Sequence, residues 1–144
     1  MTVTVDINVF LDVIQQHRQP HYAASAHVIT MVETGALSGL CPAHGLTTLY
    51  YLVRKVSTKR DAEAAMDRVL NRFQIGNLDM AGWREARTLP IDDFEDAVVA
   101  TVAKTSGSAL IITRNVGDFS GSEVQAVSPA GFLSRFPAPP AGNG

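Results

Sequence analysis

Acidic and amide side chains occur in this chain at the ends of segments that are predicted to be buried strands. Asp6 follows the apolar segment 3–5. Asn115 and Asp118 follow a second apolar segment, 109–113. In an open parallel sheet, ligands collect in the crevice beyond the carboxyl ends of the strands. We therefore expect these three side chains to meet at one edge of a sheet.

A further acid, Asp96, lies near the start of a helix predicted at 92–104, directly before the second of these strands. The helix continues with small residues at Ala97, Ala100 and Ala103, which favour close packing on a sheet. Carboxylates that are close together repel each other unless a cation offsets their charge. Because the candidate ligands are oxygen atoms, the pattern indicates a hard divalent cation, Mg²⁺ or Mn²⁺, rather than zinc.

Other polar residues near these positions have structural interpretations. Asp92 and Glu95 have the spacing of a capping box, and we expect both to cap the helix. For Asp93 two interpretations stay open: an outer metal ligand, or a favourable charge at the positive end of the helix. Asp12 is expected to be a solvated surface residue, and His44 a structural one.

The composition limits the class of protein. The 144 residues are sufficient for one domain, which we place at 1–136, followed by a Pro- and Gly-rich tail at 137–144 that is expected to be disordered. No apolar run approaches the roughly 18 residues that span a bilayer. A single cysteine permits no internal disulfide, and a cytoplasmic protein is expected. The net charge of −2 neither indicates nor excludes binding to a nucleic acid.

Strands and helices are predicted to alternate along the chain. Apolar periodicity predicts strands near 3–7, 36–41, 74–78, 109–113 and 124–127. Helices are predicted to begin at residues 8, 20 and 129. Four more are predicted at residues 44–56, 59–73, 81–89 and 92–104. Such alternation indicates an α/β fold, a three-layer α/β/α sandwich with a central, mostly parallel sheet.

The densest basic cluster consists of Arg54, Lys55, Lys59 and Arg60, between two predicted helices. One interpretation is that the cluster is a solvated helix end with no further role. As a functional surface it would contact the phosphates of a nucleic acid. The first interpretation is slightly favoured for any single one of these residues.

Three segments resemble the main motifs of a known family. VDINVFLD at 5–12, DFEDAVVATVA at 93–103, and LIITRNVGDF at 110–119 followed by VQAVSPAGFL are similar to those of the PIN domain family, in the same order. The resemblance implies an α/β/α fold and a Mg²⁺- or Mn²⁺-dependent ribonuclease. Similarity to the VapC toxins further implies an RNA substrate, a homodimer and an antitoxin protein as partner.

The resemblance also assigns roles to single residues. It implies that Asp6 and Asp96 are metal ligands and that Asn8 supports them. Asn115 matches the position of the family's last acid but is neutral. Asp118 is close enough to supply the missing charge in its place. Thr113 is a supporting residue, and Arg114 is a weak candidate for RNA binding. One departure is clear: where the family usually has Glu on the helix after the second strand, this chain has Thr48, which brings no negative charge.

Two functional hypotheses follow. The first is a metal-dependent endoribonuclease with Asp6, Asp96, Asn115 and Asp118 at its catalytic site. The second is a PIN-fold module that binds RNA or a protein without cleavage, because its metal site has lost the Glu. A phosphatase with Asp6 as the nucleophile is disfavoured, since Asn8 stands where an Asp-x-Asp arrangement would have its second acid.

Overall fold

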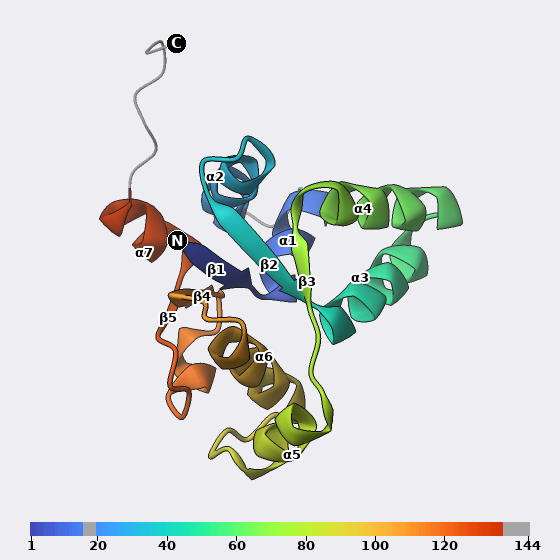
Figure 1. The fold of residues 1–144 in the computed structure, drawn as a ribbon. Helices are drawn as coiled ribbons and strands as arrows, with labels where there is room; N and C mark the ends of the chain where they lie inside the picture. The colour runs from blue at the N-terminus through green and yellow to red at the C-terminus, as the bar shows by residue number, and fades with distance from the viewer. Residues whose placement is uncertain (16–19, 137–144) are drawn as a thin grey trace.

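The computed structural model describes residues 1–15 and 20–136. Its centre is a five-stranded sheet with the order β3-β2-β1-β4-β5, in which every neighbouring pair is parallel (Figure 1). The strands are β1 (Thr2–Val5), β2 (Ser38–Pro42), β3 (Gln74–Gly76), β4 (Leu110–Ile112) and β5 (Ala126–Val127). The predicted α/β fold with a parallel sheet is confirmed.

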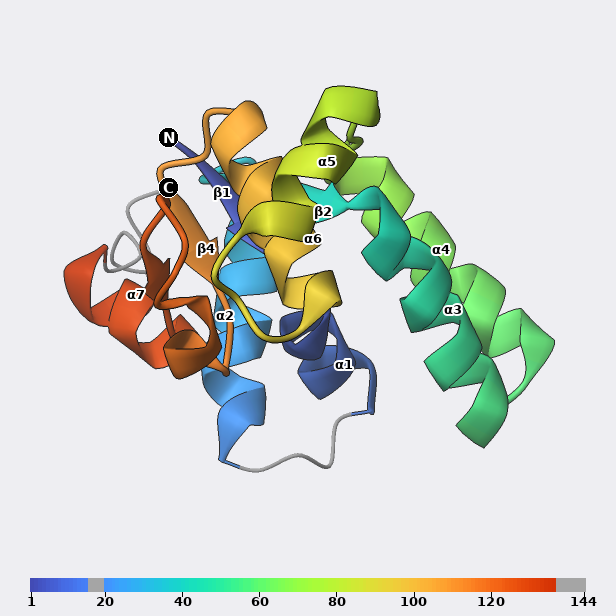
Figure 2. The ribbon, with the colours of Figure 1, turned by 90° about the horizontal axis from the view of Figure 1, so that it is seen from below.

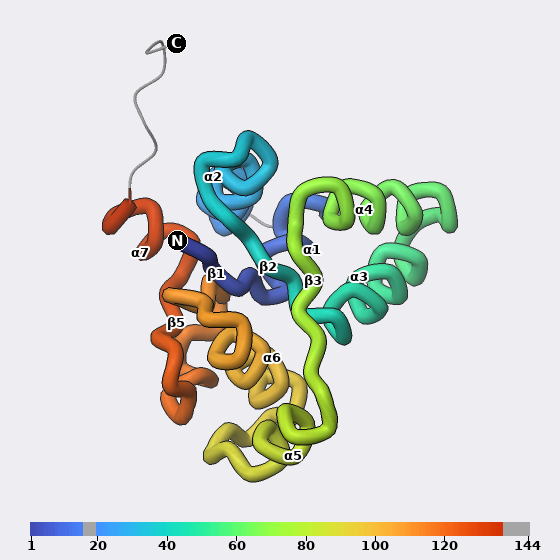
Figure 3. The backbone as a smooth tube through the Cα atoms, viewed as in Figure 1, coloured from blue at the N-terminus to red at the C-terminus, as the bar shows by residue number. Residues whose placement is uncertain are grey.

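Helices lie on both faces of the sheet (Figures 1 and 3). They are α1 (Ile7–Gln15), α2 (His21–Glu33), α3 (Ala43–Val56), α4 (Lys59–Arg72), α5 (Met80–Thr88), α6 (Phe94–Thr105) and α7 (Pro129–Arg135), with a short 3-10 helix η1 (Val116–Phe119). One face carries α1 and α2, and the other carries α6 with α5 beside it. The hairpin of α3 and α4 extends from the edge of the sheet, as Figure 2 shows from another side.

The two faces of the sheet follow from the alternation of side chains along each strand. Val3 and Val5 of β1 belong to the large apolar core that includes residues of α1, α2 and α4. Ile111 of β4 points the other way and packs with Val99, Ala100 and Ala103 of α6. The small residues of α6 are buried, as expected for a helix that packs closely on the sheet.

The start of α6 differs from the prediction. Asp92 and Glu95 do not form a capping box. Asp93 is the N-cap residue instead, and its Oδ1 accepts hydrogen bonds from the backbone N–H groups of Glu95 at 2.8 Å and Asp96 at 3.3 Å. A cap one residue later leaves Glu95 free to point away from the helix backbone.

Two further predictions concern the ends of the chain and the membrane. The disordered tail predicted at 137–144 lies outside the described residues. Within the described parts of the chain, no helix is both long and apolar enough to cross a bilayer.

Close approach of the sheet to α6 predicts a sharp effect at Gly76. A Cβ atom there would lie 2.5 Å from Cγ1 of Val102 and 2.6 Å from Cδ2 of Leu40, whereas one at Gly117 would meet nothing within 4 Å. We expect Gly76→Ala to lower the free energy of unfolding by about 1 to 3 kcal/mol. Gly117→Ala is the control, with a change below about 0.5 kcal/mol. Urea unfolding followed by circular dichroism checks both, and equal stability of the two variants would contradict the packing.

Candidate active site

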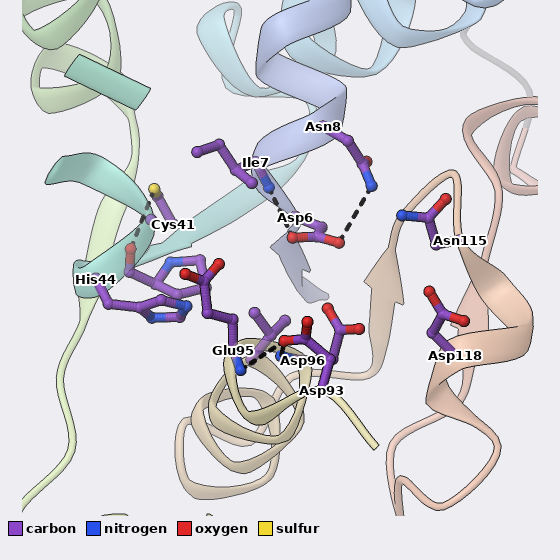
Figure 4. Close-up of a pocket in the computed structure, with 13 residues that line it drawn as sticks. Asp6, Ile7, Asn8, Cys41, His44, Asp93, Glu95, Asp96, Asn115 and Asp118 are labelled. Atoms are coloured by element: carbon purple, nitrogen blue, oxygen red, sulfur yellow. Dashed lines mark hydrogen bonds between the residues drawn. The ribbon is translucent and has the colours of Figure 1, made fainter. Parts of the chain in front are cut away.

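A cavity of about 270 Å³ opens at the carboxyl ends of the strands (Figure 4). Its walls come from the residues that follow β1, β2 and β4 and from the first turns of α3 and α6. The side chains that line it include Asp6, Asn8, Cys41, His44, Asp93, Glu95, Asp96, Asn115 and Asp118. Four segments far apart in the sequence therefore supply one concave acidic surface.

Asp6 is the most deeply held carboxylate of the cavity, with 5% of its surface exposed. Its Oδ1 accepts a hydrogen bond from the backbone N–H of Ile7 at 2.8 Å, and its Oδ2 accepts one from the hydroxyl of Thr113 at 2.9 Å. Burial raises the pKa of Asp6, and the bonds from Thr113 and Ile7 oppose that rise. The carboxylate is thus fixed in direction by donors from two neighbouring strand ends.

Asn8 and Thr113 connect β1 to the loop after β4. The amide nitrogen of Asn8 donates to Asp6 Oδ2 and to Thr113 Oγ1, both at 3.3 Å. Its amide oxygen accepts the backbone N–H of Arg114 at 3.2 Å, and Thr113 Oγ1 accepts that of Asn115 at 3.1 Å. Asn8 was expected to open the first helix, but α1 begins at Ile7. The Asn8 side chain is instead hydrogen-bonded to the segment that follows β4. The network fixes the segment that carries Asn115 relative to Asp6.

Asp96 faces Asp6 across the cavity from the first turn of α6 (Figure 4). Partial burial, together with the negative charges of Asp6, Asp93, Asp118 and Glu95, raises the pKa of Asp96 to about 6. No Lys or Arg is among the described residues that line the cavity. The acidic cluster is therefore not offset by a positive side chain of its own.

The wall near the start of α3 contains residues that the sequence analysis did not place in the site. His44 lines the cavity, and Glu95 extends toward its imidazole (Figure 4). Burial lowers the pKa of His44, although the charges of Glu95 and Asp6 act in the opposite direction. Burial next to Asp6 raises the pKa of Cys41 to about 12, so this thiol stays protonated. His44 was interpreted as a structural residue; it lines the cavity because it follows the end of β2, the neighbour of β1.

Several predicted residues lie outside the cavity. Thr48 does not line it, and its hydroxyl donates to the backbone oxygen of His44 at 3.3 Å. The basic residues Arg54, Lys55, Lys59 and Arg60 are exposed at the turn between α3 and α4. Figure 2 places this turn at the end of the hairpin that is distant from the sheet.

Asp12 is not a solvated surface residue, because its side chain is fully buried. Its Oδ2 accepts a hydrogen bond from Ser25 Oγ at 2.8 Å and lies 3.4 Å from Nε of Arg114. Asp12 Oδ1 and Arg114 Nε have no hydrogen-bond partner among the described residues. The Arg114 guanidinium, predicted as a weak RNA contact, is therefore directed into an internal ion pair.

The donor set of the cavity is suited to a hard divalent cation. Asp6, Asp96, Asp118 and Asn115 offer oxygen ligands, and burial together with the surrounding negative charges raises the pKa of Asp96. Among residues 1–15 and 20–136, no group of three or more His, Cys, Asp or Glu side chains is already arranged to hold a metal ion. The chemistry of the residues fits the ion, and exposed side chains such as Asp118 would have to move to complete a set of ligands.

The buried ion pair predicts a large cost for removing one partner. Arg114→Gln would leave the Asp12 carboxylate buried without a positive charge, and we expect a loss of about 2 to 4 kcal/mol in the free energy of unfolding. The matched control is Arg68→Gln, which breaks the more exposed pair with Glu33 and is expected to cost less than about 1 kcal/mol. Adding Asp12→Asn to Arg114→Gln should recover part of the loss in a double-mutant cycle. Similar losses for the two Arg variants would contradict the buried pair.

The excess negative charge predicts that the site destabilises the metal-free fold. Because the pKa of Asp96 is raised in the folded state, stability should fall as the pH rises between 3.8 and about 6. Asp96→Asn removes this contribution. In chelator at neutral pH we expect a gain on the order of 1 kcal/mol after solvent screening, or about 2 to 4 °C in Tm. Asp67→Asn, an exposed acid on α4, is the control; a lower Tm for Asp96→Asn would refute the prediction.

Solved structures share the fold at low sequence identity. The crystal structure of VapBC2 from Rickettsia felis, bound to a DNA fragment from their promoter, matches with TM-score 0.68 and 17% identity over 89% of this chain and 98% of that chain. FitAcB from Neisseria gonorrhoeae matches with TM-score 0.63 and 15% identity over 89% and 98%. VapC20 from Mycobacterium tuberculosis, described as a sarcin-ricin loop cleaving toxin, matches with TM-score 0.60 and 15% identity over 76% and 86%.

Comparison by sequence identifies the family. A search of curated proteins found no significant match. The family model of the PIN domain matches residues 2–117, which contain every residue that lines the cavity except Asp118, and the three motifs up to Gly117. The chain belongs to the PIN domain family.

Proposed function

We propose that the chain is a Mg²⁺- or Mn²⁺-dependent endoribonuclease. The observation that supports this most is the meeting of Asp6, Asp96 and Asp118 in one cavity that contains no Lys or Arg among its described lining residues. Membership of the PIN domain family supports the same reaction. A polyanionic substrate needs positive charge at such a surface, and a divalent cation held by these carboxylates would provide it.

The first ligands of the ion would be Asp6 and Asp96, with Asp118 and Asp93 at longer reach. A bound Mg²⁺ or Mn²⁺ would lower the pKa of a coordinated water and stabilise negative charge on a phosphate. Thr113 and Asn8 keep the Asp6 carboxylate in one orientation through bonds at 2.9 and 3.3 Å. Asn115 adds a neutral amide at the mouth of the cavity, which is able to donate a hydrogen bond to a phosphate oxygen.

His44 and Glu95 would act at the opposite wall. The lowered pKa of His44 keeps its imidazole neutral at pH 7, so it is able to accept a proton or hydrogen bond from a water. Glu95 brings a carboxylate to the α3 side of the cavity, where the resemblance expects the Glu that Thr48 replaces. We propose Glu95 as the partial substitute for that missing charge.

The alternative is a PIN module that binds RNA or a protein without cleavage. Its support is Thr48, whose hydroxyl is turned to the backbone oxygen of His44 and contributes nothing to the cavity. Fewer charged oxygen ligands mean weaker binding of a hard cation. The two functions differ in whether phosphodiester cleavage occurs at all.

We further propose that the chain is the toxin component of a toxin–antitoxin pair. Structures of similar fold are described as a toxin-antitoxin complex from Klebsiella pneumoniae and as VapBC and FitAcB. Homodimer formation stays a prediction; Tyr51, Val56 and Leu70 are exposed apolar side chains of α3 and α4 that are candidates for that interface. A cytoplasmic location and phosphate contacts by Arg54, Lys55, Lys59 and Arg60 also stay predictions.

Cleavage of RNA tests the proposal. Purified protein is incubated with transfer, ribosomal and messenger RNA in Mg²⁺, in Mn²⁺ and in chelator. We expect discrete products that require the metal, with a loss of about 100-fold or more in rate for Asp6→Asn and Asp96→Asn. Asp67→Asn, on α4 and outside the cavity, should cleave as the wild type does.

Glu95→Gln adds a second arm to the same experiment. A loss of about 10-fold or more would support Glu95 as the substitute for the missing Glu. Absence of products in either metal, from protein shown to be folded by circular dichroism, would refute the ribonuclease and favour the binding module. Products that persist in chelator or in Asp96→Asn would point to a contaminating nuclease and equally contradict the proposal.

A further inference from the structure

The helices α5 and α6 carry an exposed pair of aromatic rings that has no role in the site described above. Trp83 of α5 is 42% exposed and Phe94 of α6 is 48% exposed. Their ring centroids are 6.2 Å apart, and the ring planes are tilted by 37°. Large apolar rings that remain this exposed leave part of their faces available to a flat ligand.

The position of Phe94 connects this pair to the acidic site. Phe94 is the first residue of α6, and its two neighbours in the chain, Asp93 and Glu95, both line the cavity. The backbone of Phe94 therefore lies at the edge of the cavity, on the side of α6, and its ring contacts Trp83 of α5. A chain that enters the cavity from this side would pass over the rings.

Positive charge accompanies the rings. Arg87 lies four residues after Trp83 on α5, which places both side chains on the same face of the helix. Arg84 is also exposed, and neither arginine forms an ion pair with any described residue. The described lining residues of the cavity include no Lys or Arg, whereas these two arginines are exposed on the helix that carries Trp83 and are able to contact a phosphate.

We propose that Trp83 and Phe94, with Arg87 beside them, form a stacking platform for an unpaired base of an RNA strand whose backbone enters the cavity. Single-stranded nucleic acids are commonly bound by aromatic rings that stack on bases and by cations that contact phosphates. An apolar segment of a protein would be less well matched, because charged side chains (Asp93, Glu95, Arg84 and Arg87) flank the rings. The inference rests on the proposed ribonuclease function and adds the residues that would hold an unpaired base of the substrate.

Trp83 is the only tryptophan of the chain, so its fluorescence reports directly on the platform. Asp96→Asn in Mg²⁺ and the wild type in chelator, neither of which should cleave, are titrated with a short single-stranded RNA. The same RNA as a duplex and heparin, a polyanion without bases, are the comparison ligands. We expect the single strand alone to quench and shift the emission.

Substitutions then separate stacking from charge. Trp83→Leu and Phe94→Leu should each weaken binding of single-stranded RNA by about 5- to 100-fold in fluorescence polarisation, whereas Trp83→Phe should retain most of the affinity. The matched control is Phe136→Leu, an aromatic residue that follows α7 and is 39% exposed. Arg87→Gln should reduce the dependence of affinity on salt, and Arg135→Gln on α7 should not.

Unchanged Trp83 emission during RNA binding that polarisation detects would overturn the platform, as would an equal response to heparin. Wild-type affinity in Trp83→Leu and Phe94→Leu would overturn it as well, and so would absence of any RNA binding. The cleavage assay keeps this result separate from the proposed function. Metal-dependent cleavage with unchanged Trp83 emission would support the ribonuclease and contradict the platform. Quenching of Trp83 without cleavage would support the platform and contradict the ribonuclease.

Discussion

The repulsion between carboxylates gathered at one edge of the sheet is the constraint on which the rest of the site depends. Asp6 is buried with both oxygens hydrogen-bonded, and Asp96 lies across from it with its pKa raised to about 6. A fold gains no stability from such an arrangement, because burial and like charge both disfavour ionisation. Clusters of this kind are typical of sites in which a cation offsets the charge, and the proposed function follows from that need.

Structural features within and around the cavity hold the acids together. The buried small residues of α6, from Ala97 to Ala103, bring that helix onto β4 so that Asp96 reaches the carboxyl edge of the sheet. Asn8 connects Asp6 to the backbone that carries Asn115. The Asp12–Arg114 ion pair lies one step further from the cavity and ties α1 to the loop after β4. The positions of the acids are therefore set by contacts among the residues that surround them.

The sequence predicted the fold and the acids that follow β1 and β4, because apolar periodicity marks strands and strand ends mark the edge of a parallel sheet. It did not predict His44 and Glu95 in the cavity, since their positions depend on the order of the strands and on a cap at Asp93. Asp12 was misjudged for a related reason. Helical spacing predicts which side of α1 carries Asp12. Only the packing of α1 against α2 and Arg114 shows that this side is buried.

Crystals grown with Mn²⁺ would test the central claim most directly, because the anomalous scattering of Mn²⁺ locates the ion without reference to activity. The carboxylate cluster predicts a peak in the cavity with oxygen atoms of both Asp6 and Asp96 as ligands, and its loss in Asp96→Asn. A structure at saturating Mn²⁺ with no peak there, or with an ion that contacts neither side chain, would contradict the assignment of this cavity as a metal site.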